Sequence, residues 1–192
     1  MLQLLEDTPL DAEQRDCLQA AAQAATRLTS LLSDILDLSR VEANKLALVT
    51  EPFTLTDLRE AVLSLFRTAA FKKGVTLTCT LHDGVPPLVV GDPARLRQIL
   101  FNLVGNALKF TDTGRIWVDI SPLPTADPQM ARLLIEVGDT GIGISDADAA
   151  SIFKPFIQAE RSATRAYQGA GLGLAIVRRL AQLMDERSWI WM

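Results

Sequence analysis

Apolar positions in the first part of the chain recur in alternating steps of four and three residues. The series is Cys17, Ala21, Ala24, Leu28, Leu31, Ile35 and Leu38. This spacing is the heptad seam of a long helix that packs against another helix. Thr8 and Pro9 fit a helix start, with the threonine as the cap and the proline in the first turn. Residues 1–6 have the pattern of the end of an earlier helix, so we expect a helical hairpin whose first arm is short.

The seam has two candidate partners, which are the chain's own domain and a second copy of the chain. Self-association is favoured because the seam is long and the pattern that follows it is different. The small side chains of Ala21 and Ala24 also permit a close approach of two helices. We therefore expect residues 1–45 to form a dimerisation hairpin.

After Asn44 the pattern changes to a mixture of short strands and amphipathic helices. We expect strands at residues 46–49, 75–81, 115–120, 132–137 and 189–191. We expect helices at residues 56–72, from Asp92 to about residue 110, and 172–184. On the second helix, the expected buried stripe consists of Leu96, Ile99, Leu100, Leu103 and Ala107. Strands that neighbour one another in sequence, together with helices, predict an α+β fold, a two-layer α/β sandwich over residues 46–192.

The composition narrows the class of function. The chain has 192 residues, of which 48% are hydrophobic, and a net charge of −4. These values are typical of a globular protein, and they argue against nucleic acid as a partner, because a phosphate backbone is bound through clustered Lys and Arg. Cys17 and Cys79 are far apart and form no metal-binding pattern, which is typical of a reducing compartment.

The chain also gives no sign of membrane insertion. No apolar run reaches the length needed to cross a bilayer, and the acidic start differs from the basic start of a signal peptide. We therefore expect a cytoplasmic location, with any membrane anchor of a full-length protein lying outside residues 1–192.

Polar residues recur at helical spacing on one face of the predicted helix at 92–110. They are Arg95, Asn102, Asn106 and Lys109. Asparagine is unfavourable inside a helix, because its amide competes for backbone hydrogen bonds. A carbonyl oxygen of Asn106 would suit Mg²⁺, which prefers hard oxygen ligands and also binds phosphates and water. Lys109 would balance phosphate charge. The alternative is a solvated polar face.

Asp139 directly follows an apolar predicted strand. Its carboxylate only accepts hydrogen bonds when ionised. It would therefore accept from the exocyclic amine of adenine and reject guanine, which has a carbonyl there. Gly141 and Gly143 carry no side chains, so the backbone can lie close to a base. The alternative is a simple glycine turn after a strand.

A second glycine-rich segment contains Gly169, Gly171 and Gly173. A dinucleotide-binding fingerprint would need a strand directly before it, whereas residues 162–168 are polar and loop-like. We interpret the glycines as a flexible hinge that leads into a helix N-terminus, where backbone N–H groups hold phosphate oxygens.

Residues 152–158 lie between the two glycine-rich segments and have the character of a lid. Phe153 and Phe156 would anchor this lid through apolar contacts, although ordinary core packing would explain them equally well. Lys154, Arg161 and Arg165 would bring positive charge near a triphosphate.

These motifs, in this order, resemble those of the sensor histidine kinases of two-component signalling. NLVGNALKF at residues 102–110 resembles their N box, and GDTGIGI at 138–144 resembles their first glycine box. IFKPFIQ at 152–158 resembles their F box, and GAGLGLA at 169–175 their second glycine box. DILDLSRVEANKL at 34–46 resembles the end of their dimerisation helix and its link to the ATP domain. Each motif alone is weak, but the ordered set is highly specific and covers nearly the whole chain.

The resemblance implies a Bergerat-type ATP-binding fold with ATP and Mg²⁺ as ligands, and a homodimeric four-helix bundle formed through residues 1–45. It implies transfer of the ATP γ-phosphate to a histidine of the dimerisation domain, for relay to an aspartate of a response-regulator receiver domain. By position, Asn102, Asn106 and Lys109 are the implied catalytic residues, and Asn106 is the implied Mg²⁺ ligand. The implied nucleotide-binding residues are Arg95, Asn102, Asn106, Lys109, Phe110, Asp139, Gly141, Gly143, Ile144, Phe153, Phe156, Arg165, Gly169, Gly171, Leu172, Gly173 and Leu174.

Asn102 bears on the type of reaction. Related ATPases, such as the topoisomerases and mismatch-repair enzymes, carry a glutamate at this position that activates water. An amide cannot act as a general base at neutral pH. Asn102 therefore favours phosphotransfer over hydrolysis.

The sequence departs from the family at three places. The phosphoacceptor motif, His-Glu followed by Arg-Thr-Pro, is missing, and the only histidine is His82, which we expect in a surface loop. We therefore expect a fragment that binds ATP without labelling itself. Gln168, Gly169 and Ala170 stand where the family commonly has Gly-Gly-Thr, which is expected to weaken nucleotide binding without abolishing it. Residues 185–192 replace a glycine turn and strand hairpin, so we expect the ATP domain to lack its last strand.

Three functions remain open at this point. The favoured one is the catalytic, ATP-binding part of a sensor histidine kinase. A related ATP-hydrolysing enzyme of the same superfamily is disfavoured by Asn102 and by the heptad hairpin. A non-catalytic dimerising scaffold with a degenerate nucleotide pocket is disfavoured by Asn106, Asp139 and the glycines, whereas Gln168 supports it.

Overall fold

The computed structural model describes residue 8 and residues 10–42, 46–127, 130–149, 151–157 and 171–184. The chain divides into two compact units, Met1–Leu46 and Ala47–Met192.

In its described part, the first unit is one long helix, α2 (Ala12–Glu42). Asp11 Oδ1 accepts a hydrogen bond from the Gln14 N–H at 2.8 Å, and Gln14 Oε1 accepts one from the Asp11 N–H at 3.1 Å. This reciprocal capping satisfies two backbone donors at the helix start. The predicted start at Thr8 and Pro9 is therefore wrong. The predicted first arm, residues 1–6, lies outside the described residues.

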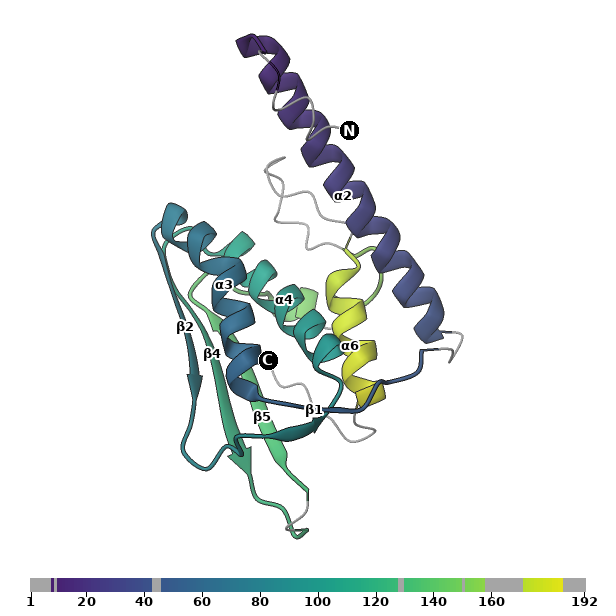
Figure 1. Cartoon of the computed structure of the whole chain (residues 1–192), viewed down its shortest axis with the longest axis vertical. Helices are drawn as coiled ribbons and strands as arrows, with labels where there is room; N and C mark the ends of the chain where they lie inside the picture. The colour runs from purple at the N-terminus through teal and green to yellow at the C-terminus, as the bar shows by residue number, and fades with distance from the viewer. Residues whose placement is uncertain are drawn as a thin grey trace. The chain divides into compact units, whose positions relative to one another are not determined.

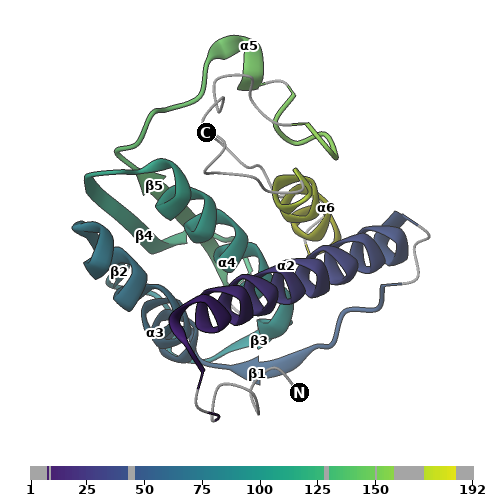
Figure 2. The ribbon, with the colours of Figure 1, turned by 90° about the horizontal axis from the view of Figure 1, so that it is seen from above.

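The second unit consists of helices layered on a sheet (Figures 1 and 2). Its elements are β1 (Glu51–Phe53), α3 (Leu55–Lys73), β2 (Val75–Leu81), β3 (Val89–Gly91), α4 (Pro93–Phe110), β4 (Gly114–Leu123), β5 (Arg132–Asp139), α5 (Asp146–Ala149) and α6 (Gly173–Met184). The three-stranded sheet has the order β2-β4-β5, with β2 parallel and β5 antiparallel to β4. α3 and α4 lie side by side on one face of this sheet, and α6 packs beside α4. This arrangement confirms the predicted α+β two-layer sandwich.

The hydrophobic core lies between the helices and the sheet. Val62 of α3, Val104 of α4 and Val118 of β4 are all 0% exposed. Val104 belongs to the buried stripe of α4, although the predicted stripe did not contain it. Ile99 and Leu103, which were included, are only half-buried. Because this stripe fixes how α4 rotates about its axis, it also determines which polar side chains of α4 face away from the core.

Most of the predicted elements of the second unit are confirmed, with small shifts at their ends. α3 begins after Thr54, whose side chain accepts from the Asp57 N–H at 3.0 Å, and it ends at Gly74 with a φ of 73°. The predicted strand at 46–49 is wrong, because the Val49 N–H donates to Asp92 Oδ2 at 3.0 Å instead of joining a sheet. β1 and β3, which form a separate antiparallel pair, were not expected. The predicted strand at 189–191 lies outside the described residues.

The side chain of Asp92 joins the start of α4 to the segment before β1. Substitutions of Asp92 therefore test this part of the fold. Its Oδ1 accepts from the Arg95 N–H and its Oδ2 from the Val49 N–H, each at 3.0 Å, and the residue is 5% exposed. Asp92→Ala removes both acceptors and is expected to lower the free energy of unfolding by about 2 kcal/mol, measured by urea denaturation. Asp92→Asn keeps the cap but presents an amide to Val49, so we expect a loss of about 1 kcal/mol. Equal losses in the two variants would contradict this account.

Candidate functional site

The C-terminal end of α4 lies directly against the loop that follows β5. The Ile142 N–H donates to the Phe110 carbonyl at 3.3 Å. A Cβ atom added to Gly141 would lie 2.4 Å from the same carbonyl oxygen and 2.8 Å from Asp139 Oδ1. No side chain fits there, so glycine is needed at position 141 for this close approach. The N box and the first glycine box, which are far apart in sequence, are thus joined at one point.

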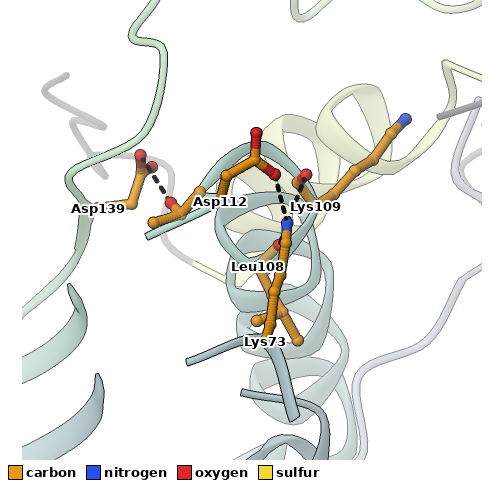
Figure 3. A network of polar contacts seen from close by, with 6 residues as sticks. Lys73, Leu108, Lys109, Asp112 and Asp139 are labelled. Carbon is orange, nitrogen blue, oxygen red and sulfur yellow. Dashed lines mark hydrogen bonds and ion pairs between the residues drawn. The ribbon is translucent and has the colours of Figure 1, made fainter. Parts of the chain in front are cut away.

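Asp139 ends β5 and is held by two donors. The Gly141 N–H donates to its Oδ1 at 2.8 Å, and the Thr111 hydroxyl donates to the same oxygen at 3.3 Å. Figure 3 shows Asp139 beside the end of α4. Thr111 is 0% exposed, whereas Asp139 is exposed. Within the described residues, no donor reaches Oδ2. One carboxylate oxygen therefore fixes the side chain, and the other can accept a hydrogen bond from a ligand.

Asn102 lies where α6 begins. A Cβ atom added to Gly173 would lie 3.0 Å from Asn102 Oδ1, so the first turn of α6 comes close to the middle of α4. Gly171 just before it has a φ of +70°, a conformation that favours glycine. Leu172, between the two glycines, is 1% exposed and packs inside. The N box and the second glycine box are therefore adjacent in space.

The F box is tied to the second glycine box. The Phe156 N–H donates to the Gly171 carbonyl at 3.0 Å. Phe156 itself is 68% exposed, whereas Ile152 is 8% exposed. The interpretation of Phe156 as an apolar anchor is therefore wrong, and Ile152 serves as the buried residue of this segment. Phe153 is half-buried.

Asn106 and Lys109 lie one turn apart on α4 and are both half-buried. Burial lowers the pKa of Lys109 below the ordinary value for lysine. Its ammonium lies 4.8 Å from the centre of the Phe110 ring, and no carboxylate pairs with it among the residues that the structure covers. In Figure 3 the Lys109 side chain extends away from Asp139. The site thus has a carboxylate on one side and a partly buried lysine on the other.

The remaining predicted site residues are not shown in contact with Asp139, Asn102 or Asn106. Arg95 lies in the first turn of α4, where its guanidinium donates to Gln98 Oε1 at 2.8 Å. The helical rise separates it from Lys109 by roughly 21 Å, so the structure does not bring the two together. Gly143 has a φ of +68°. Ile144 is 52% exposed, and Leu174 is half-buried. The predicted residues Arg165 and Gly169 lie outside the described residues.

Sequence reasoning missed two residues that build the site, Thr111 and Ile142. Thr111 directly follows the N box, and a buried hydroxyl after a helix end is a signal that could have been noticed. Ile142 contributes its backbone N–H, and its side chain is 71% exposed. Nothing in the residue type of Ile142 indicates this role.

Two glycines of the motifs are expected to respond to alanine in opposite directions. Gly141→Ala forces the loop away from Phe110, so we expect the free energy of unfolding to fall by about 1–3 kcal/mol. Gly105 lies inside α4, and an added Cβ would meet Phe66 at 3.8 Å, an ordinary contact. Gly105→Ala is expected to stabilise the fold by about 0.5–1 kcal/mol, because alanine favours the helix. Urea denaturation of both variants measures the two signs, and a neutral Gly141→Ala would contradict the described packing.

Two family profiles match the chain. The profile of the histidine kinase-, DNA gyrase B-, and HSP90-like ATPases matches residues 91–192. The profile of the His Kinase A (phospho-acceptor) domain matches residues 1–44. The first match alone covers more than half of the chain.

Curated relatives are histidine kinases that are much longer than this chain. It is 42% identical over 183 residues to the autoinducer 2 sensor kinase/phosphatase LuxQ of Vibrio cholerae, covering 95% of this chain and 21% of that protein. It is 38% identical over 177 residues to the signal transduction histidine-protein kinase BarA of Escherichia coli, covering 92% of this chain and 19% of that protein. The chain therefore spans about a fifth of the length of these relatives.

Solved structures of histidine kinases have the same fold. Full-length ShkA in complex with AMPPNP matches with a TM-score of 0.79 at 36% identity, over 96% of this chain and 37% of that chain. The histidine kinase AdeS of Acinetobacter baumannii matches with a TM-score of 0.65 at 24% identity, over 94% of this chain and 81% of that chain, and this likeness shows the fold alone.

Of the helices that the structure describes, none has both the length and the apolar character needed to span a bilayer. The match to the ATPase profile over more than half of the chain, preceded by the match to the phospho-acceptor profile, confirms the family that the motifs indicated: the chain belongs to the sensor histidine kinases, and its larger unit has their ATP-binding fold.

Proposed function

We propose that residues 47–192 bind Mg²⁺-ATP and transfer its γ-phosphate to a histidine of a dimerisation domain. The observation that carries this proposal is the arrangement of Asp139, whose Oδ1 is held by Thr111 and Gly141. An ionised carboxylate accepts hydrogen bonds only, so Oδ2 would accept from the exocyclic amine of adenine. The ATP analogue bound in the related ShkA structure supports this assignment.

Asn106 and Lys109 would serve the phosphate side of the nucleotide. The side-chain carbonyl of Asn106 is a hard oxygen donor of the kind that Mg²⁺ prefers. Mg²⁺ would supply charge neutralisation between the phosphates. The lowered pKa of Lys109 reports a charge that burial disfavours, and phosphate oxygens nearby would offset that cost.

Asn102 supports phosphotransfer rather than hydrolysis. It lies beside the start of α6, with its Oδ1 3.0 Å from where a Cβ of Gly173 would be. Its amide cannot take a proton from water at neutral pH, so this position lacks the general base that an ATPase needs. The N–H groups of the first turn of α6 would hold phosphate oxygens beside it.

The first unit would supply the dimerisation surface. Several large apolar residues of α2 are exposed in the single chain, among them Leu28 at 59%, Leu32 at 54% and Leu36 at 56%. We propose that a second copy of residues 1–45 covers them in a homodimer, because apolar burial favours association. The acceptor motif is absent from the sequence, and the only histidine, His82, follows β2 with its Nε2 3.7 Å from an Asp119 oxygen.

The phosphoryl group would then pass to an aspartate of a response-regulator receiver domain. The relatives support this partner through their family, and the match to the phospho-acceptor profile supports it at residues 1–44.

Cys17 and Cys79 are both free thiols in the structure. Free thiols are typical of a reducing compartment, and we place the reaction in the cytoplasm.

The first experiment measures nucleotide binding through stability. At about 100 times its dissociation constant, Mg²⁺-ATP should stabilise the fold by roughly 2.7 kcal/mol, seen as a shift in thermal unfolding. We expect this shift to be lost in Asp139→Asn, whose amide donates toward the adenine amine, and to be absent with Mg²⁺-GTP. Asp83→Asn, a change at an exposed loop carboxylate, is the matched control and should keep the full shift. No shift of the native chain with millimolar ATP would favour the scaffold function instead.

The second experiment separates a kinase from an ATPase. A hairpin that carries the acceptor histidine is joined to residues 47–192 and incubated with ATP labelled at the γ-phosphate. We expect acid-labile phosphohistidine with little free phosphate, and loss of labelling by about 100-fold or more in Asn106→Ala, because a Mg²⁺ ligand that stabilises charge in the transition state is removed. Rapid release of free phosphate without labelling of the histidine would instead support the hydrolytic alternative.

A further inference from the structure

Lys73, the last residue of α3, reaches the end of a different helix. Its ammonium donates to the Leu108 carbonyl at 2.8 Å and to the Lys109 carbonyl at 3.2 Å. It also lies 3.2 Å from an Asp112 carboxylate oxygen. Figure 3 shows these contacts at the C-terminal end of α4, close to Asp139. Neither the resemblance nor the comparisons assign any role to this lysine.

The strand register places Lys73 at this point. Gly74 ends α3 in the left-handed conformation and leads straight into β2. Val75, the first residue of β2, pairs in parallel with Gly114, the first residue of β4. Asp112 precedes Gly114 by two residues, just as Lys73 precedes Val75 by two. The lysine is therefore held opposite the end of α4 by the sheet, and not only by a flexible side chain.

Lys73 completes the capping of α4. A helix leaves its last carbonyls without intrahelical partners. Here the Ala107 carbonyl accepts from the Thr111 N–H at 3.0 Å, and the Phe110 carbonyl accepts from the Ile142 N–H at 3.3 Å. The two carbonyls between them, of Leu108 and Lys109, accept from Lys73. The ammonium also places a positive charge at the negative end of the helix dipole.

We propose that Lys73 is a positioning residue for the phosphate side of the nucleotide site. This inference rests on the proposed function, in which Asn106 and Lys109 serve the Mg²⁺-triphosphate. Both belong to the last turns of α4, whose carbonyls Lys73 holds. Without its charge, the negative helix end is left uncompensated beside the proposed triphosphate, and the last turn loses two hydrogen bonds. The effect should therefore increase with the number of phosphates on the ligand.

The test measures dissociation constants of the full chain at a temperature where every variant is folded. In Lys73→Met we expect the constant for Mg²⁺-ATP to rise about tenfold and that for adenosine to rise less than threefold. Lys73→Arg retains charge and donors and should stay within about threefold of the native chain for Mg²⁺-ATP. Lys72→Met is the matched control, because it removes an exposed lysine of the same helical turn, and it should leave both constants unchanged.

The possible results are separable. An affinity of Lys73→Met for Mg²⁺-ATP equal to that of Lys72→Met overturns the inference, as does an equal loss for Mg²⁺-ATP and adenosine. If Lys73→Met does not fold, Lys73→Gln is measured instead, because it keeps a donor without the charge. We expect its affinity for Mg²⁺-ATP to fall by more than about threefold, and a smaller change overturns the inference. Failure of the native chain to bind Mg²⁺-ATP overturns the proposed function itself, and with it the basis of the inference.

Discussion

The second unit depends on how the C-terminal end of α4 is satisfied. A helix end leaves carbonyl groups that must find donors elsewhere, because buried polar groups without partners are costly. Here the donors come from α3, through Lys73, and from the loop after β5, through Ile142. Both segments must therefore meet α4 at one point. Asp139 sits at that meeting point, held by Thr111. The candidate site is thus a consequence of closing the helix end, and not a separate addition to the sandwich.

Glycine is required in the two glycine boxes for different physical reasons at different positions. Gly141 leaves room for the Phe110 carbonyl, and Gly173 leaves room for Asn102. Gly171 and Gly143 instead have φ values of +70° and +68°, which other residues adopt only with strain. The two glycine boxes therefore mark the places where backbone crosses α4 or turns sharply. Such crossings allow a ligand to lie against backbone groups, as the proposed nucleotide would.

Elements with strong local signals could be predicted, and those that depend on distant partners could not. Alternation over residues 75–81 predicted β2 with the same bounds that the structure shows, and Asp92-Pro93 predicted the start of α4. β1 and β3 were missed because each has three residues and each is defined by pairing with the other across the intervening α3 and β2. The motifs indicated Asp139 and Asn106 as candidate site residues. Lys73 was not located, because its partner follows from the register of β2 with β4, which no local pattern contains.

The charges around the C-terminal end of α4 bear on whether a triphosphate can bind beside it. The negative end of a helix dipole alone would repel phosphate. At the end of α4, Lys73 donates to the terminal carbonyls, and the partly buried Lys109 adds a second cation. Next to Asn102, α6 presents its N-terminus, the positive end of its own dipole. On the proposed function, the triphosphate would lie between a neutralised helix end and an attractive one. On that function, the close approach of Gly173 to Asn102 would bring the N-terminus of α6 to the same ligand.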